Sequence, residues 1–333
     1  MGIEVLRPGA LTTVQDSGRT GYAARGYPAC GACDRAAMIL ANLLAGNPGE
    51  AAVLECTWTG PALRFEEKTV GALSGADMNA FLNGVPVETG RPFHIPAGGV
   101  LELGTAAAGL RTYLAVHGGI TVPPVLGSRS TDLRSRIGGL EGRALRAGDR
   151  LPAAGCPESP RKARLLTERR ERLEDWTLGP RTPQCWIGDK RMPVLRAVPG
   201  PQEERFTEKA LKTFFREIYR LSPDSDRMAA RFEGPKLETA GGADILSDGV
   251  VEGSVQVSAG GMPMVMLADH QTVGGYAKIA TVIPCDIPAL AQLRPGEEAR
   301  FRAVSREAGM EAMRLERIRL DTIQRIMTGA RGR

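Results

Sequence analysis

Residues 50–155 form short apolar or alternating runs, separated by turn signals about ten residues apart. The runs cover residues 52–58, 69–73, 91–95, 100–103 and 111–116. Asn83-Gly84 and the Ala-Gly-Gly segment 97–99 are typical of the turns that join neighbouring strands. No strand–helix–strand alternation occurs, so the pattern favours a mainly β fold, an antiparallel sandwich or barrel. The 41 glycines and 23 prolines of the chain supply the turns that such a fold needs.

The strand pattern resumes after a charged segment that is bounded by prolines. We therefore predict four segments: a first β unit at 1–156, a charged linker at 157–184, a second β unit at 185–306 and a C-terminal amphipathic helix at 307–333. Each β unit has one prominent helix, with Asp34 as the predicted N-cap of the first and Thr207 as that of the second. The C-terminal helix either docks on its own domain or pairs with another subunit, and both options remain open.

The net charge of +5 and the pI of about 9.0 would by themselves fit a nucleic-acid-binding protein. The excess positive charge lies outside the predicted β units, however. Residues 157–181 carry seven basic and five acidic groups, and residues 310–333 carry six and three. The other basic and acidic groups balance, and aromatic residues make up only 5% of the chain. We therefore expect no nucleic-acid binding.

Hydrophobic runs and the N-terminus bear on cellular location. No run approaches the roughly 18 apolar residues that a membrane-spanning helix needs. Residues Met1–Glu4 lack the basic segment and apolar stretch that define a signal peptide. We expect a cytoplasmic protein without membrane contacts.

The six cysteines include one closely spaced pair, Cys30 and Cys33, and the three histidines are scattered. A zinc site needs a second such pair or paired histidines, so we expect no metal, and we interpret the pair as incidental small residues in a turn. The sequence also lacks a P-loop, a His-Glu-x-x-His motif and a Gly-x-Ser-x-Gly elbow. No Met-Lys-Met-like tripeptide offers a lysine for biotin attachment.

Three clusters of polar residues among glycines stand out instead. They lie at residues 12–19, at 127–132 followed by Gly138-Gly139, and at 254–257 continued by 269–276. Glycine lets a ligand or a second backbone approach closely, and Ser, Thr, Gln and Arg side chains can hydrogen-bond an amide or a carboxylate. The alternative is ordinary turn chemistry, with Arg129 and Asp132 paired to hold loops together.

These clusters also carry a resemblance to a known family. The matching motifs follow one another in order between residues 3 and 305: 13–22, 31–34, 41–47, 113–120, 127–133, 199–202, 225–228, 253–257 and 271–276. Together they resemble the allophanate hydrolase subunit 2 family, also called the biotin-dependent carboxyltransferase family. One departure is Cys33, which stands where the family usually has Met and so weakens a redox interpretation further.

The resemblance implies tandem cyclophilin-like β-barrel domains with a few helices. It also implies a subunit of an ATP-dependent 5-oxoprolinase, inactive alone, that helps to open 5-oxoproline (pyroglutamate), a small amide, to glutamate. The implied partners are a PxpB-like subunit (allophanate hydrolase subunit 1) and a PxpA-like subunit (LamB/YcsF). The complex would use ATP at a site that the sequence does not locate.

Candidate site residues come from the polar clusters within these motifs. Arg19 and Arg129 are candidates for holding a substrate carboxylate or a transferring phosphate, because a guanidinium offers fixed bidentate donors. Asp132 is the candidate base, or the group that orients an arginine. The substrate-binding candidates are Gln15, Asp16, Ser128, Thr131, Gln256, Gln271, Thr272, Gly274, Gly275 and Tyr276. We expect one cleft, between the β units or at a partner junction, lined by Gln15, Asp16, Arg19, residues 128–132, Gln271, Thr272 and Tyr276.

Two other functions remain open. The chain could be the carboxyltransferase half of a biotin-dependent urea or amide carboxylase, although the biotin carboxylase and carrier usually fused to such a region are not in this sequence. It could also be a KipA-like regulator that binds a kinase inhibitor. Adjacent genes for PxpA-like and PxpB-like subunits would favour the 5-oxoprolinase, and a gene for a biotin carrier would favour the carboxylase.

Overall fold

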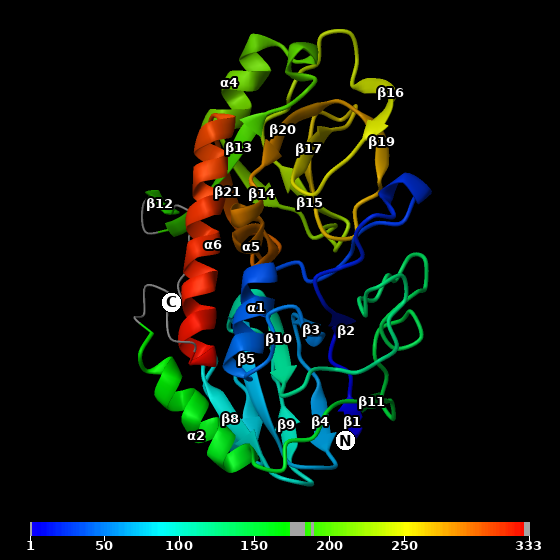
Figure 1. Cartoon of the computed structure of the whole chain (residues 1–333). Coiled ribbons are helices and arrows are strands. Elements are labelled where there is room, and N and C mark those ends of the chain that lie inside the picture. Colours follow the sequence, from blue (N-terminus) through cyan, green and yellow to red (C-terminus); the bar gives the residue numbers. More distant parts are fainter. Residues whose placement is uncertain (1, 174–183, 188–189, 330–333) are drawn as a thin grey trace. The chain divides into compact units, whose positions relative to one another are not determined.

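The structure is a computed structural model that describes residues 2–173, 184–187 and 190–329. The chain forms two compact units. Unit 1 comprises residues 1–19, 30–179 and 318–333, and unit 2 comprises residues 20–29 and 180–317. In both units strands outnumber helices (Figure 1), so the predicted mainly β fold is confirmed.

Unit 1 contains two antiparallel sheets. The six-stranded sheet has the order β11-β1-β4-β9-β6-β7 and the five-stranded sheet the order β2-β3-β10-β5-β8. The strands of the first are β1 (Gly2–Arg7), β4 (Ala62–Phe65), β6 (Phe81–Leu82), β7 (Val85–Pro86), β9 (Val100–Glu102) and β11 (Arg150–Pro152). Those of the second are β2 (Leu11–Gln15), β3 (Val53–Thr57), β5 (Thr69–Asp77), β8 (Pro92–Ile95) and β10 (Ala108–Val116).

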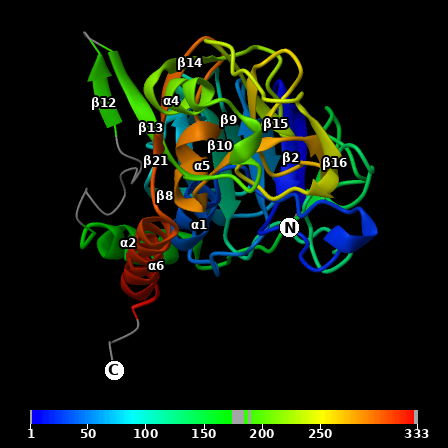
Figure 2. The ribbon, with the colours of Figure 1, turned by 90° about the horizontal axis from the view of Figure 1, so that it is seen from above.

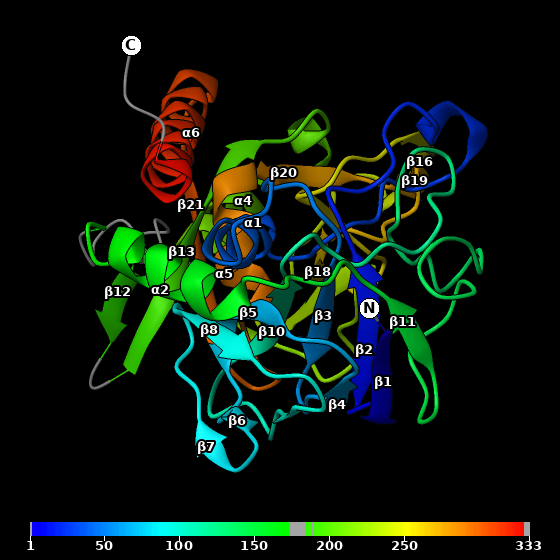
Figure 3. The same cartoon turned by 60° about the horizontal axis from the view of Figure 1, so that its bottom comes forward.

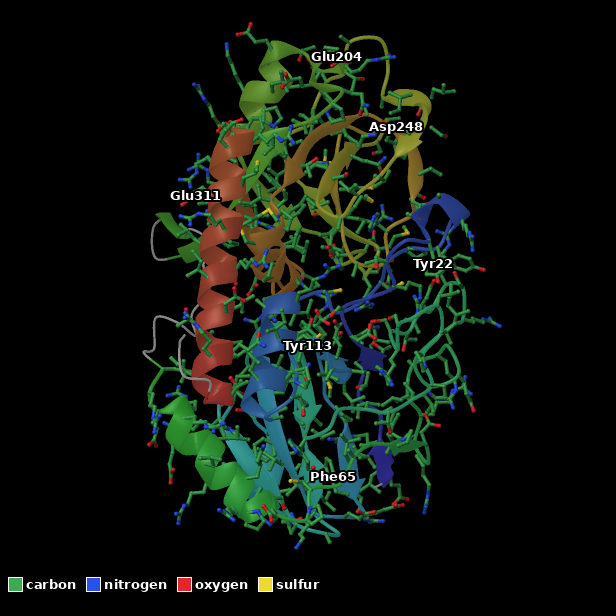
Figure 4. The ribbon with its side chains drawn as sticks, viewed as in Figure 1. Tyr22, Phe65, Tyr113, Glu204, Asp248 and Glu311 are labelled. Atoms are coloured by element: carbon green, nitrogen blue, oxygen red, sulfur yellow. The ribbon has the colours of Figure 1, made fainter. Side chains whose placement is uncertain are left out.

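The alternation of side chains along β10 shows how unit 1 is layered. Leu114 and Val116 belong to the core that also contains Phe65 of the six-stranded sheet. Tyr113 and Ala115 belong to a second cluster, which contains the helices of the unit. Successive side chains of a strand point to opposite faces. The five-stranded sheet is therefore the middle layer. Figure 4 labels Tyr113 in this sheet and Phe65 in the six-stranded outer sheet.

Three helices cover the outer face of the five-stranded sheet: α1 (Arg35–Leu44), α2 (Ser159–Arg170) and the second half of α6 (Arg306–Thr328). Helix α1 lies along β5 and β10 (Figure 1), and α2 lies beside β8 (Figure 3). The Asp34 side chain accepts a hydrogen bond from the Ala37 N–H at 2.8 Å, which confirms the predicted N-cap. Arg169 of α2 donates to the Met327 carbonyl at the end of α6, at 2.7 Å.

Seven strands of unit 2 close into a barrel. Their order is β13-β20-β17-β18-β15-β14-β21, and a parallel pairing of β21 with β13 closes the ring. The bounds are β13 (Lys190–Pro199), β14 (Ile218–Leu221), β15 (Ala229–Glu233), β17 (Ser254–Val257), β18 (Pro263–Met266), β20 (Lys278–Val282) and β21 (Glu298–Ala303). Outside the ring, β12 (Gln184–Ile187) pairs with β13 (Figure 2), and β16 (Asp244–Gly249) pairs with β19 (Val273–Tyr276).

An aromatic cluster fills one part of the barrel core. Phe214 of helix α4 (Glu208–Arg216) stacks on Phe301 of β21 with ring centroids 4.5 Å apart, and Phe232 meets Phe301 edge-on. Thr207 Oγ1 accepts from the Ala210 N–H at 3.1 Å, which confirms the second predicted N-cap. The other helices within the described residues are α5 (Ile287–Ala291) and the short 3₁₀ turns Ala23–Arg25, Glu203–Arg205 and Pro284–Asp286.

The two units interleave along the chain, whereas the sequence pattern predicts successive segments with boundaries at 156, 184 and 306. The residues after 317 belong to unit 1 because Ile323 and Met327 of α6 pack in the cluster beside α1 and α2. Helix α2 lies in the first part of the predicted linker, and residues 174–183 of that linker lie outside the described residues. None of the described helices is long and apolar enough to cross a membrane.

Candidate functional site

The carboxylate of Asp16, directly after β2, organises the first polar cluster. Its Oδ1 accepts hydrogen bonds from the Gly18 N–H at 2.8 Å and from the hydroxyls of Ser128 and Ser130 at 2.6 Å each. Its Oδ2 accepts from the Arg129 N–H at 2.6 Å. Four donors leave this carboxylate little capacity for a substrate, so Asp16 acts on the loop at 128–130 and positions it.

Two further contacts hold the same loop along β2. Thr131 donates to the Val14 carbonyl through both its N–H, at 2.9 Å, and its Oγ1, at 3.0 Å. The Gln15 Nε2 group donates to the Thr131 carbonyl at 3.2 Å and to Thr13 Oγ1 at 3.0 Å. The structure therefore brings together, within unit 1, the predicted residues of the first two clusters.

Arg19 is only 2% exposed and lies at the edge of this loop. Its Nη2 donates to the Ser130 carbonyl, while its Nε and Nη1 are buried and have no hydrogen-bond partner among the residues that the structure describes. Gly138, with φ of +68°, makes room for the guanidinium, because a Cβ there would lie 2.7 Å from Nη2. A buried charge with unused donors is costly, so an oxyanion would complete this site.

Asp132 and Gln15 supply unused acceptors at the same loop, residues 128–132. Asp132 is 1% exposed, and its Oδ1 accepts from the N–H groups of Arg134 and Ser135 at 3.0 Å each. Its Oδ2 and the Oε1 of Gln15 are buried without a partner in the described part of the chain. Arg129 instead donates from Nε to the Val122 carbonyl at 2.8 Å. Arg129 and Asp132 thus take different partners, and the alternative that pairs them is not seen in the described residues.

The candidates of the third cluster lie in unit 2. Gln256 of β17 donates to the Tyr276 carbonyl at 3.3 Å. A Cβ on Gly274 would lie 2.6 Å from the Gln256 amide nitrogen and 3.0 Å from that of Gln271, so the glycine lets the two amides approach. Thr272 accepts from the Val250 N–H through its carbonyl. Gly275 and Tyr276 end β19, beside β16, on which Figure 4 labels Asp248. A single cleft lined by both sets of residues stays a prediction.

Sequence reasoning missed a buried ion pair in unit 2. Arg227 is 5% exposed, and it donates to Asp269 from Nε and Nη2 at 2.9 Å each. The Asp269 N–H also donates to the Arg227 carbonyl, at 3.0 Å. Arg227 lies in the 225–228 motif that carries the family resemblance, so a signal for it was present. Lys278 is a second missed group: it is buried and donates to Asp248 at 2.8 Å.

A buried polar cluster beneath the start of α1 was also missed. Glu55 Oε2 accepts from the Tyr113 hydroxyl and from the Cys33 N–H at 2.9 Å each, and the Asp34 N–H donates to the same hydroxyl at 2.7 Å. Burial, and then the negative charge of Glu55, raises the pKa of Tyr113 well above its usual range. A charged residue within the apolar run 52–58 was the available signal. These bonds fix the N-terminus of α1, which is a structural role.

Cys30 and Cys33 are both buried, and Cys30 adopts a positive φ of 54°. Neither forms a disulfide. No group of three or more His, Cys, Asp or Glu side chains that could hold a metal ion occurs within the described ranges.

The chain is similar to proteins of known name over nearly its whole length. It is 39% identical to the C subunit of the Escherichia coli 5-oxoprolinase over 93% of this chain and 94% of that protein. It is 36% identical to the C subunit of the Haemophilus influenzae 5-oxoprolinase over 98% of both. The solved structure of the K. lactis urea amidolyase matches with a TM-score of 0.84 and 28% identity over 97% of this chain, but only 20% of that enzyme. Residues 25–303 match the family model "Carboxyltransferase domain, subdomain A and B". The chain belongs to this carboxyltransferase domain family.

Proposed function

We propose that this chain is the C-type subunit of an ATP-dependent 5-oxoprolinase, which opens 5-oxoproline to glutamate. The observation that carries the proposal is the length of the similarity. The matches to the two bacterial subunits cover 93–98% of this chain and 94–98% of those subunits, whereas the urea amidolyase match covers only 20% of that enzyme. A chain that matches nearly all of a named subunit is best explained as the same kind of subunit.

We further propose that the partners are PxpB-like and PxpA-like chains and that the location is the cytoplasm. The related proteins are named as subunits, which supports an assembly with partner chains. The sequence contains no P-loop or other familiar phosphate-binding motif. The chain alone should therefore turn over little or no ATP, with the nucleotide site completed by a partner.

The proposed chemistry has to overcome the resonance of the lactam. Transfer of the γ-phosphoryl group of ATP to the lactam oxygen makes the ring carbon electrophilic. Water then adds to this carbon, the C–N bond breaks, and the nitrogen takes the proton from water. A second water hydrolyses the resulting acyl phosphate to glutamate and phosphate. The unused donors of Arg19 suit the carboxylate of 5-oxoproline, and the unpartnered Asp132 Oδ2 suits its N–H.

The experiment that tests this function is reconstitution. The chain is combined with its PxpB-like and PxpA-like partners, and ADP and glutamate are measured with and without 5-oxoproline. We expect glutamate only from the complete assembly, and no 5-oxoproline-dependent ADP from the isolated chain. Robust turnover by the chain alone would contradict the proposed subunit role, and an inactive complete assembly would contradict the proposed activity.

A second candidate is the carboxyltransferase half of a urea carboxylase. The fold match to the urea amidolyase favours it, because nearly all of this chain superposes on part of that enzyme. The same reconstitution separates the two functions when urea and a carboxylated biotin carrier replace 5-oxoproline and ATP. Carboxylation of urea, with no release of glutamate from 5-oxoproline, would favour the second candidate.

A further inference from the structure

The Arg19 guanidinium has more hydrogen-bonding capacity than its surroundings use. A guanidinium carries five N–H donors, and one donor of Nη2 is directed at the Ser130 carbonyl. The three N–H donors on Nε and Nη1 have no partner in the described structure. Each of these two nitrogens is adjacent to Nη2, whose second N–H is not directed at Ser130, so one edge of the group can still bind a carboxylate in bidentate fashion.

Two hydrogen-bond acceptors at the loop that Arg19 contacts are also unused, and other hydrogen bonds fix the orientation of both side chains. Gln15 is held by its Nε2, which donates to the Thr131 carbonyl, and this leaves Oε1 as the unused atom. Asp132 is held by its Oδ1, which accepts two backbone N–H groups, and this leaves Oδ2 unused. Arg19 and Gln15 contact residues 130 and 131, next to Asp132, so the unused donors and acceptors lie along three consecutive residues.

We propose that these groups form a binding site, the Arg19 site, for a small ligand that carries one carboxylate and one N–H donor. The Arg19 site consists of Arg19, Gln15 and Asp132, held by residues 128–131. Arg19 binds the carboxylate, and Gln15 Oε1 and Asp132 Oδ2 accept from the ligand's N–H. The inference rests on the proposed function only for the identity of that ligand, since 5-oxoproline has both groups.

Charge favours a carboxylate over a phosphoryl group at this site. Arg19 supplies a buried positive charge with unused donors in the described structure, and Asp16 and Asp132 are acidic neighbours in the same loop contact. A carboxylate brings one negative charge, whereas a phosphate monoester brings about 1.5 to 2 at neutral pH. The second charge of a phosphoryl group would be buried near two carboxylates without compensation.

The first test compares two probes that differ by the carboxylate. L-5-oxoproline and 2-pyrrolidone share the lactam, and only the former is an acid. Their dissociation constants for the full chain are measured by calorimetry, with acetate and inorganic phosphate as further probes. We expect the chain to bind 5-oxoproline at least about tenfold more tightly than 2-pyrrolidone, as a charge-assisted bidentate contact should allow. The Arg19→Met variant should lose this preference and keep its weak binding of 2-pyrrolidone.

The matched control is Arg25→Met, since Arg25 is an exposed arginine six positions along the chain. It should keep the full preference for 5-oxoproline. Arg19→Lys should recover part of the preference, because Lys keeps the charge and loses the planar fork.

The second readout is the melting temperature without ligand. If the unused donors of Arg19 are satisfied only by a bound ligand, Arg19→Met removes an uncompensated buried charge from the free protein. The melting temperature of this variant should then equal or exceed that of the parent chain. 5-Oxoproline should raise the melting temperature of the parent chain and leave that of Arg19→Met unchanged.

The outcomes separate the site from the function. Arg19-dependent binding of acetate without binding of 5-oxoproline would keep the Arg19 site and remove 5-oxoproline as its ligand. Arg19-dependent binding of phosphate alone would overturn the carboxylate assignment. The site itself is overturned if no probe binds the parent chain, if Arg19→Met binds 5-oxoproline normally, or if that variant melts several degrees lower with its ligand preference intact.

Discussion

Two buried arginines, one in each unit, differ in what surrounds the guanidinium. Arg227 in unit 2 is paired through two parallel hydrogen bonds with the carboxylate of Asp269. Arg19 in unit 1 is buried to a similar degree, but its described partner is a single backbone carbonyl. The carboxylate of Asp269 neutralises the first guanidinium, whereas no described residue supplies a counter-ion for the second. Burial alone therefore does not distinguish a structural arginine from a binding one, whereas the use of its donors does.

The largest effect should come from breaking the neutralised pair. Arg227→Met leaves the Asp269 carboxylate largely buried without its partner, and we expect a loss of about 3 kcal/mol or more in the free energy of unfolding. Urea denaturation measures this loss. The control is Arg220→Met, which removes an exposed ion pair with Glu298 and should cost less than about 1 kcal/mol. Equal losses in the two variants would show that the Arg227 pair is not the structural element that the geometry indicates.

A somewhat smaller effect is expected from Asp16→Asn. The Asp16 carboxylate accepts four hydrogen bonds, and the NH₂ group of an asparagine would face some of those donors instead of accepting from them. We expect the free energy of unfolding to fall by about 2–3 kcal/mol and ligand binding to weaken. Asp77→Asn is the control, because its carboxylate accepts one exposed backbone hydrogen bond, from Asn79. Urea denaturation and calorimetric binding are the two measurements. An unchanged midpoint for Asp16→Asn would argue against a positioning role.

The third prediction compares two glycines with the same backbone conformation. Gly138 (φ +68°) and Gly148 (φ +88°) both occupy the left-handed region, where an added Cβ costs about 1–2 kcal/mol. At Gly148 the Cβ meets nothing within 4 Å, but at Gly138 it meets the Ser130 carbonyl oxygen at 2.1 Å and Arg19 Nη2 at 2.7 Å. Gly138→Ala should therefore be the less stable variant and should also weaken 5-oxoproline binding. Equal thermal shifts with normal binding would remove Gly138 from the Arg19 site.

The smallest effect concerns a partly exposed ion pair. Arg143 donates two hydrogen bonds to the Asp149 carboxylate, at 2.7 and 2.9 Å. These bonds hold the pKa of Asp149 below its ordinary value. Because the folded-state pKa is the lower one, the stabilisation is complete above the unfolded-state value of about 3.9 and is lost as the pH falls through the folded-state value. Asp149→Asn should reduce stability by about 1 kcal/mol or less at pH 7 and remove part of the acid sensitivity. Urea midpoints at pH 7 and pH 3 test this, and an unchanged difference between them would contradict it.

The fold class was readable because its signals are local. Alternating runs such as 111–116 became strands with one face in each cluster, and Asp34 and Thr207 cap the helices that they were expected to cap. The polar clusters around Asp16 and Ser128 were also visible as glycine-rich polar sequence. Each of these signals lies within a few residues of the feature that it predicts.

The hydrogen-bond partners of the polar side chains could not be predicted from the sequence, because tertiary contacts determine them. The sequence places Asp132 three residues from Arg129, yet Arg129 bonds to the Val122 carbonyl and Asp132 to the turn that follows it. Arg227 and Asp269 are 42 residues apart, and nothing in the sequence marks them as a pair. The interleaving of the units has the same origin, since the end of α6 is placed by its packing with α1 and α2.

The interleaving also constrains the order in which the protein can fold during synthesis. Strand β13 pairs with β21, so the barrel cannot close before about a hundred intervening residues have been made, which takes roughly 5–20 s at ribosomal rates. Unit 1 begins at β1 but receives Ile323 and Met327 only after the whole barrel sequence has been translated. Until then, the apolar surface that these two side chains cover on α1 and α2 stays open to chaperones and to aggregation. Both units are therefore completed at nearly the same moment. A chain that is truncated shortly before residue 318 would contain every strand of the barrel but lack the segment that completes unit 1.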